Sequence, residues 1–292
     1  MSRLIVLFIY VFSLFFAGCL LAYPAHLIID IDFERIVSRS VLLCAVVLFY
    51  PTLKALKIKN LGEIGWSTQS PTSTLGKAWG LGVVMLFPIS LFYIVCGFRF
   101  WEPLAPSLLG PTITIITAII SGLLVGLIEE TILRGFLQSQ LNKVMTVVLS
   151  VIIVNLIYST VHFLEPADTF TLTSVHWYSG YTVLVAAFSS LLQFELFWDS
   201  WLALFLAGVF LSVVRIKSNL IWCIGIHAGW VAHLKVFKSF TDRNNEAPCM
   251  AYASDYDNYT GEFTAIWLTC LLVIWGIIEL MRRRQTRIYR KR

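Results

Sequence analysis

The sequence predicts an all-α fold, a polytopic transmembrane helical bundle of about eight spans. Of its 292 residues, 58% are hydrophobic and only 13% are charged, whereas soluble domains are about half apolar and about a quarter charged. The apolar residues form long runs, and about 20 such residues are enough to cross a bilayer. Lysines and arginines gather beside the ends of these runs, as they do on the cytoplasmic side of membrane proteins.

The N-terminal part, residues 1–110, is expected to contain about three spans. Their apolar runs cover residues 4–23, 40–53 and 78–98. A polar loop over residues 24–39 separates the first two, and a proline-containing segment over 99–109 leads to the fourth span. Three lysines directly after the second run place that end in the cytoplasm by the positive-inside rule. They are Lys54, Lys57 and Lys59.

Residues 111–238 are expected to contain four further spans. The runs that predict them cover residues 112–141, 145–163, 201–214 and 220–237. The apolar segment 181–192 is only about a dozen residues long, a length that is more typical of re-entrant or interfacial segments. We therefore expect that this segment does not cross the bilayer.

With that count, the polar loop 239–262 lies outside the cell, and the last span, within residues 263–292, returns a basic tail to the cytoplasm. Arginines directly after an apolar span are typical of a cytoplasmic anchor, so the tail is expected to bind anionic lipids. No nucleic acid partner is expected. The sequence therefore predicts a multi-pass protein of the cell membrane.

The six cysteines are expected to be small core residues. None belongs to a C-x-x-C motif and most lie in apolar runs, so neither a disulfide framework nor a zinc cluster is predicted. These cysteines are Cys19, Cys44, Cys96, Cys223, Cys249 and Cys270.

Three charges stand together at the end of the apolar run 111–128, namely Glu129, Glu130 and Arg134. A charge within a span costs about 2.5–3.5 kcal/mol on insertion scales, and such residues are usually functional or paired. Glu130 and Arg134 are four residues apart on one helix face, so they are expected to form an ion pair. Glu129 is rotated away by about 100°, which makes it the better candidate for an acid or a base.

Two of the five histidines, His162 and His227, lie in the apolar runs of two other predicted helices. Ionisable groups in a bilayer tend to face the bundle interior, so both are expected to converge with Glu129. A lone intramembrane histidine is about as often a hydrogen-bonding residue between helices as it is a catalytic residue. Two histidines and a glutamate pair on three helices favour a functional site.

This set of side chains suits hydrolysis. A buried glutamate can act as a general base, and nearby histidines can orient water, protonate a leaving amine or stabilise an oxyanion. Two histidines and a glutamate could instead bind zinc with one open position. A proton- or ion-coupled transporter built on the same buried charges is an alternative, and so is a catalytically silent membrane scaffold.

The combined motifs resemble those of the CPBP family, also called Abi, of intramembrane proteases, which includes the Ras-converting CAAX endopeptidase. The resemblance covers roughly residues 111–234. It rests on Glu129-Glu130-x-x-x-Arg134 with the following Gly135-Phe136-Leu137-Gln138, on Tyr158-x-x-x-His162, and on Gly225-Ile226-His227-Ala228.

The resemblance implies a catalytic core over residues 111–238, in which Glu129 activates water with help from His162 and His227. It implies an intramembrane endopeptidase that cleaves a membrane-proximal or lipidated protein or peptide substrate. A glutamic-type mechanism without a cofactor is expected, with zinc as the minority alternative.

Two positions depart from the family pattern. Tyr158 stands where the family usually has phenylalanine, and Val231 stands where it usually has asparagine or aspartate, four residues after His227. In the family, that polar side chain is thought to help hold the oxyanion, and valine cannot donate a hydrogen bond. We hypothesise that the hydroxyl of Tyr158 or the amide of Asn155 substitutes. Bridging of neighbouring helices is the alternative role for both.

Overall fold

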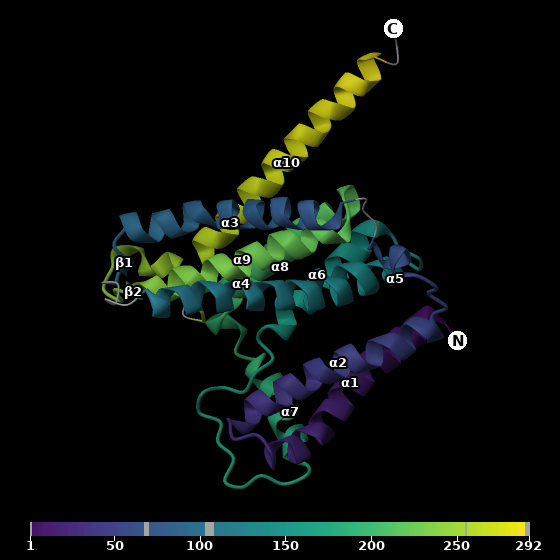
Figure 1. Ribbon diagram of the computed structural model, residues 1–292, viewed down its shortest axis with the longest axis vertical. Coiled ribbons are helices and arrows are strands. Elements are labelled where there is room, and N and C mark those ends of the chain that lie inside the picture. Colours follow the sequence, from purple (N-terminus) through teal and green to yellow (C-terminus); the bar gives the residue numbers. More distant parts are fainter. Residues whose placement is uncertain (1, 67–69, 103–107, 255, 290–292) are drawn as a thin grey trace.

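The chain is built almost entirely of helices (Figure 1). The computed structural model describes residues 2–66, 70–102, 108–254 and 256–289, with the backbone alone for residues 284–289. The helices are α1 (Arg3–His26), α2 (Phe33–Ala55), η1 (Leu61–Ile64), α3 (Pro71–Val95), α4 (Leu109–Glu130), η2 (Thr131–Leu137), α5 (Gln138–Leu141), α6 (Val147–Val161), α7 (Ser179–Ser190), η3 (Phe194–Leu196), α8 (Trp198–Lys217), α9 (Leu220–Phe240), η4 (Pro248–Tyr252) and α10 (Glu262–Tyr289). Two short strands, β1 (Arg99–Trp101) and β2 (Thr241–Arg243), pair antiparallel.

Seven helical stretches in the described part of the chain are long and apolar enough to cross a membrane. They are α1, α2, α3, the continuous stretch Leu109–Leu141 that joins α4, η2 and α5, α8, α9, and Glu262–Arg283 of α10. The remaining predicted span corresponds to α6, an apolar helix of 15 residues that is shorter than the others. The expected polytopic helical bundle is therefore confirmed, and α7, with 12 residues, is as short as expected.

Helix α9 lies at the centre of the bundle, between α3 and α4 (Figure 1). In its most apolar stretch of 18 residues, 67% of the residues are buried, against 44% in the corresponding stretch of α8, the next most buried span. Small residues allow this close packing, because a Cβ atom at Gly82 would clash with the main-chain oxygen of Ile226, and one at Gly122 with that of Ala228. Such small-residue contacts are the usual way in which membrane helices approach one another.

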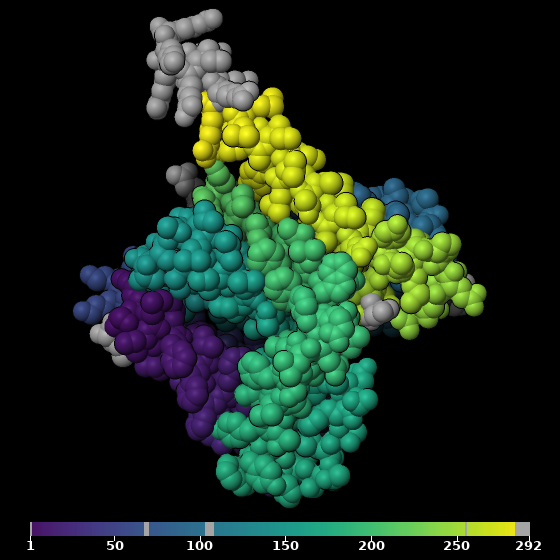
Figure 2. All heavy atoms as spheres, turned by 180° about the vertical axis from the view of Figure 1, so that it is seen from behind, coloured from purple at the N-terminus to yellow at the C-terminus, as the bar shows by residue number. Residues whose placement is uncertain are grey.

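The N-terminal helices α1 and α2 form a hairpin at one side of the bundle, and α7 packs on it (Figure 1). Figure 2 shows α1 in purple beside the green segment that carries α7. The hairpin contacts the central bundle through Phe136, whose ring meets the rings of Tyr10 and Phe49 edge-on at 5.8 and 5.3 Å. Helices α1 and α2 therefore pack against η2, the segment that follows Glu130.

The prediction of a polar loop over residues 24–39 is wrong at both ends. Helix α1 continues to His26 and α2 already begins at Phe33. Phe33, Ile36 and Val37 are buried, at the spacing of one helix face, so their burial favours helix over loop. Of the proline-containing segment expected over 99–109, residues 103–107 lie outside the described part.

The prediction that the cysteines are only core residues is wrong for one pair, because Cys96 and Cys249 form a disulfide. Cys96 directly follows α3 and Cys249 lies in the short helix η4. The pairing of β1 with β2 brings these two segments together despite a separation of 153 residues. Cys19, Cys44 and Cys223 are unpaired and buried as expected, whereas the unpaired Cys270 is exposed.

The basic tail continues α10 to Tyr289. Its side chains from residue 284 onward lie outside the described part. Lipid binding by this tail therefore stays a prediction.

Candidate active site

Three helices bring Glu129, His162 and His227 to one place. Glu129 stands next to the last residue of α4, His162 directly follows α6, and His227 lies within α9. Oε2 of Glu129 is 4.0 Å from Nε2 of His162 and 3.9 Å from Nε2 of His227. The carboxylate thus faces both imidazoles, at distances that are longer than a direct hydrogen bond.

Glu130 points into a fully buried network instead. Its Oε1 accepts a hydrogen bond from Nη1 of Arg134 at 3.0 Å, and neither side chain is exposed. The predicted ion pair is therefore confirmed. The same oxygen also accepts from Nδ1 of His227 at 2.8 Å, a contact that no sequence spacing indicated, because the two residues are 97 positions apart.

Arg134 extends this network to α6. Its Nη2 donates to Oδ1 of Asn155 at 3.1 Å, and its guanidinium lies 4.3 Å from the centre of the Tyr158 ring. A buried arginine needs such partners, because an unpaired charge in the bundle would be strongly destabilising. Glu130, Arg134 and Asn155 therefore fix α4, α6 and α9 relative to one another.

A π-helical stretch follows the two glutamates directly, over Thr131–Leu137. Insertions of this kind occur frequently at functional sites, because they change the direction of the side chains that flank them. At Gly135 in this stretch, a Cβ atom would lie 3.0 Å from Leu220 and 3.1 Å from the main-chain oxygen of Ile64. The π-helix was not predicted, since helical periodicity alone does not signal one extra residue in a turn.

The tautomer of His162 follows from its surroundings. Its Nδ1 lies 2.7 Å from the main-chain oxygen of Tyr158, and a carbonyl oxygen can only accept a hydrogen bond, so Nδ1 carries the proton. In the neutral ring, Nε2 then presents its lone pair toward Glu129.

Asn155 and Tyr158, the two candidate oxyanion donors, occupy different positions. Both amide protons of Asn155 are engaged, by the main-chain oxygen of Val151 at 2.7 Å and by Oγ of Ser212 at 2.9 Å. The ring of Tyr158 lies between those of His162 and His227, with centroids 4.6 and 6.2 Å away. Its hydroxyl makes no hydrogen bond within the part of the chain that the structure describes, so Tyr158 is the one with a proton to donate.

Two cavities flank these side chains. One, of about 340 Å³, is lined by Glu129, Tyr158 and His162 and by residues of α1, α2 and α7. The other, of about 200 Å³, is lined by Tyr158, His162, His227 and Val231 and by residues of α8, α10 and the loop before α10. Tyr158 and His162 line both cavities, so these two side chains stand between the two spaces.

The loop before α10 closes over the end of α6 through Tyr256. Its hydroxyl lies 2.7 Å from both the main-chain oxygen of His162 and Oε1 of Glu165, and its ring packs on Phe163. Burial and the neighbouring Glu165 raise the pKa of the Tyr256 phenol, so the hydroxyl keeps its proton and donates it. This contact holds the main chain at His162 in place from outside the helix, and no spacing in the sequence indicated it.

No group of three or more His, Cys, Asp or Glu side chains among the described residues is arranged to hold a metal ion.

Residues 111–233 match the family model described as type II CAAX prenyl endopeptidase Rce1-like. The matched segment begins in α4 and ends in α9, so it contains Glu129, His162 and His227 but less than half of the chain. No significant match was found among curated proteins or among solved structures.

Proposed function

We propose that this multi-pass membrane protein is a glutamic-type intramembrane endopeptidase of the CPBP family, because residues 111–233 match the model of the Rce1-like type II CAAX prenyl endopeptidases. It hydrolyses a peptide bond in a membrane-proximal or lipidated protein, with Glu129 as the general base. We place it in the cell membrane. The match to the family model supports the assignment as a protease. The arrangement of Glu129, His162 and His227 supports the roles that we assign to them.

One observation carries the proposal: the two neighbouring glutamates differ in their partners. Oε2 of Glu129 is buried and has no hydrogen-bond partner among the described residues. Glu130 is occupied by Arg134 and His227. Oε2 of Glu130 also has no partner among the described residues, but that side chain is fully buried, whereas the side chain of Glu129 is partly exposed and lines the cavity of about 340 Å³. A general base must reach the water whose proton it removes, so Glu129 is the better placed of the two.

In the proposed reaction, a water molecule between Glu129 and His162 donates one hydrogen bond to each. Glu129 removes a proton as the water oxygen bonds to the scissile carbonyl carbon, and the carbonyl electron pair moves to its oxygen. The proton then passes from Glu129 to the amide nitrogen as the carbon–nitrogen bond breaks. Each step conserves charge without a cofactor, and His162 keeps the water aimed through its Nε2 lone pair.

The developing oxyanion needs donors, because charge stabilisation is usually the largest contribution to such a reaction. Tyr158 supplies its hydroxyl in place of the polar residue that Val231 lacks. His227 supplies Nε2 when its ring is protonated, a form that Glu130 stabilises through Nδ1. Glu130 and Arg134 are thus positioning residues, and Asn155 supports them.

The walls of the larger cavity suggest how a substrate is held. Beside Glu129, they are mostly apolar side chains from the α1–α2 hairpin and α7, which suits a lipid chain or apolar residues of a membrane protein. Helices α1 and α2 lie outside the matched segment 111–233. We therefore assign part of substrate selection to the α1–α2 hairpin, which the matched segment does not include.

The test is a cleavage assay on a library of membrane-proximal and prenylated peptides, with the protein in nanodiscs. Glu129→Gln should lower cleavage by about a hundredfold to ten-thousandfold, the usual contribution of a positioned general base. The matched control, Glu195→Gln, changes an exposed glutamate in η3 and should cleave normally. Full activity of a folded Glu129→Gln variant contradicts the proposal, and loss of activity on adding a chelator would favour zinc over the glutamic mechanism.

A further inference from the structure

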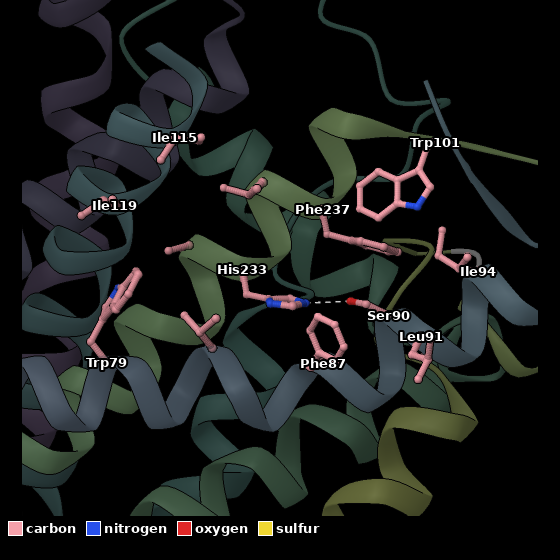
Figure 3. A pocket seen from close by; sticks show the side chains of 13 residues that line it. Trp79, Phe87, Ser90, Leu91, Ile94, Trp101, Ile115, Ile119, His233 and Phe237 are labelled. Carbon is pink, nitrogen blue, oxygen red and sulfur yellow. Dashed lines mark hydrogen bonds between the residues drawn. The ribbon is translucent and has the colours of Figure 1, made fainter. Parts of the chain in front are cut away.

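A third cavity, of about 380 Å³, lies between α3, α4 and α9 and shares no lining residue with the two cavities of the site. Its volume is within the range of small-molecule sites. Figure 3 shows His233 in its wall, bonded to Ser90 and surrounded by apolar and aromatic side chains. Four of these are large exposed hydrophobic residues, so the cavity opens on the surface that faces the lipid. They are Phe87, Leu91, Trp101 and Ile115.

A chain of hydrogen bonds fixes the proton of His233. The Tyr259 hydroxyl donates its only proton to the main-chain oxygen of Leu86 at 3.0 Å, because a carbonyl cannot donate. Ser90 lies 3.0 Å from that hydroxyl and must therefore donate to it. The 2.7 Å contact between Ser90 and Nε2 of His233 then requires the proton on Nε2.

The hydrogen bond from His233 to Ser90 has two consequences. Ser90 is not a nucleophile activated by His233, because the histidine donates to it. In the neutral ring, Nδ1 carries the lone pair. Among the described residues, the hydrogen bond of the His233 ring is made by Nε2 alone, and the ring lies in the wall of the cavity, with Nδ1 on its other side (Figure 3). An acceptor left unpaired in apolar surroundings is costly, so a ligand that donates a hydrogen bond fits there.

The depth of this acceptor restricts the ligand. His233 lies seven residues before the end of α9 and Ser90 five before the end of α3, which corresponds to about 10 and 8 Å at the helical rise. That is close to the boundary between head groups and acyl chains. The cavity extends from there along α3 to Trp79, roughly 16 Å further into the membrane by the same rise.

We propose that this cavity is a lipid-binding site for an uncharged lipid with a free hydroxyl group. The hydroxyl donates to Nδ1 of His233, and one apolar chain fills the space between α3, α4 and α9. The lining contains no Asp, Glu, Lys or Arg, so it offers nothing to an ionic head group. The site is independent of the proposed peptidase activity.

The probe is a photoreactive diacylglycerol in phosphatidylcholine nanodiscs, compared with the same molecule after acetylation of its hydroxyl. The free hydroxyl should label peptides of α3, α4 and α9 roughly fivefold to tenfold more strongly, the effect of one added hydrogen bond. His233→Phe should abolish this preference, and His176→Phe, in a loop, should keep it. Ile119→Trp should reduce labelling by both probes, because Ile119 lines the cavity without touching the hydrogen-bonded chain.

Equal labelling of the natural sequence by the two probes overturns the proposal, because the cavity then accepts any acyl chain. A preference that persists in folded His233→Phe also overturns it. The comparison of the two probes on the natural sequence decides the question even where a variant does not fold. Since the readout is labelling, its failure leaves the assignment of Glu129 untouched.

Discussion

At the scale of single residues, two adjacent glutamates have opposite surroundings because a helix turns by about 100° per residue. Glu130 faces α9, where His227 binds its Oε1, and the same oxygen pairs with Arg134 of η2. Glu129 faces the larger cavity and keeps an oxygen without a hydrogen bond among the described residues. One residue therefore holds the site together while the other remains available for proton transfer.

Tyr158 is the proposed oxyanion donor, because Val231 cannot donate a hydrogen bond. Tyr158→Phe should lower kcat by about 100-fold, the typical effect of removing one oxyanion donor, with little change in KM. The ring and its contact with Arg134 remain, so the fold should be unaffected.

Steady-state kinetics of the purified variant in nanodiscs provide the measurement, with Tyr178→Phe, an exposed tyrosine, as the control. Normal kcat in Tyr158→Phe would show that another group holds the oxyanion and would remove Tyr158 from the mechanism.

Much of the site could be predicted at this scale, but not all of it. The spacing of Glu130 and Arg134 predicted their ion pair, because residues four apart meet on a helix. The bond between Glu130 and His227 depends on how α4 and α9 are rotated against each other, and no local spacing encodes that rotation. The engagement of both Asn155 protons likewise depends on Ser212, a residue of α8.

At the scale of elements, apolar runs predicted the spans because length and hydropathy alone decide which helices can cross a bilayer. Helix ends were less predictable. Burial of Phe33 and Ile36 extends α2 into the expected loop, and this burial arises from tertiary contacts. The disulfide was missed for the same reason, since only the pairing of β1 and β2 reveals that Cys96 and Cys249 are neighbours.

The disulfide between these loops gives an element-scale prediction. Denatured protein that has not been reduced should bind maleimide at four cysteines, because four are free, and at all six after reduction. Mass spectrometry of the labelled protein counts the adducts. Cys249→Ser should bind five without reductant, and six adducts on the unreduced natural sequence would show that the bond does not form.

At the scale of the whole molecule, the positive-inside orientation and the disulfide agree. The predicted topology places Cys96 and Cys249 on the same, non-cytoplasmic side, and disulfides persist in oxidising compartments. The lysines after α2 and the basic end of α10 lie at the opposite ends of their helices. This orientation follows from the sequence, and the disulfide independently supports it.

The arrangement of the whole bundle also encloses the region around Glu129. Helices α4 and α9 and the end of α6 carry Glu129, His227 and His162, while the N-terminal hairpin, α7 and the loop before α10 build the cavities around them. In the proposed peptidase, water and peptide meet inside the membrane, and these walls limit access to the space beside Glu129.

The most direct test of the central claim compares Glu129→Gln with Glu130→Gln in one experiment that measures both peptide cleavage and thermal unfolding. Glu129→Gln should lose cleavage and keep its unfolding temperature, because it removes a charge with no ion-pair partner closer than 3.9 Å. Glu130→Gln should lose stability as well, by about 3–5 kcal/mol, because it leaves Arg134 buried without a counter-charge. A stable Glu129→Gln variant that cleaves at the normal rate would contradict the account.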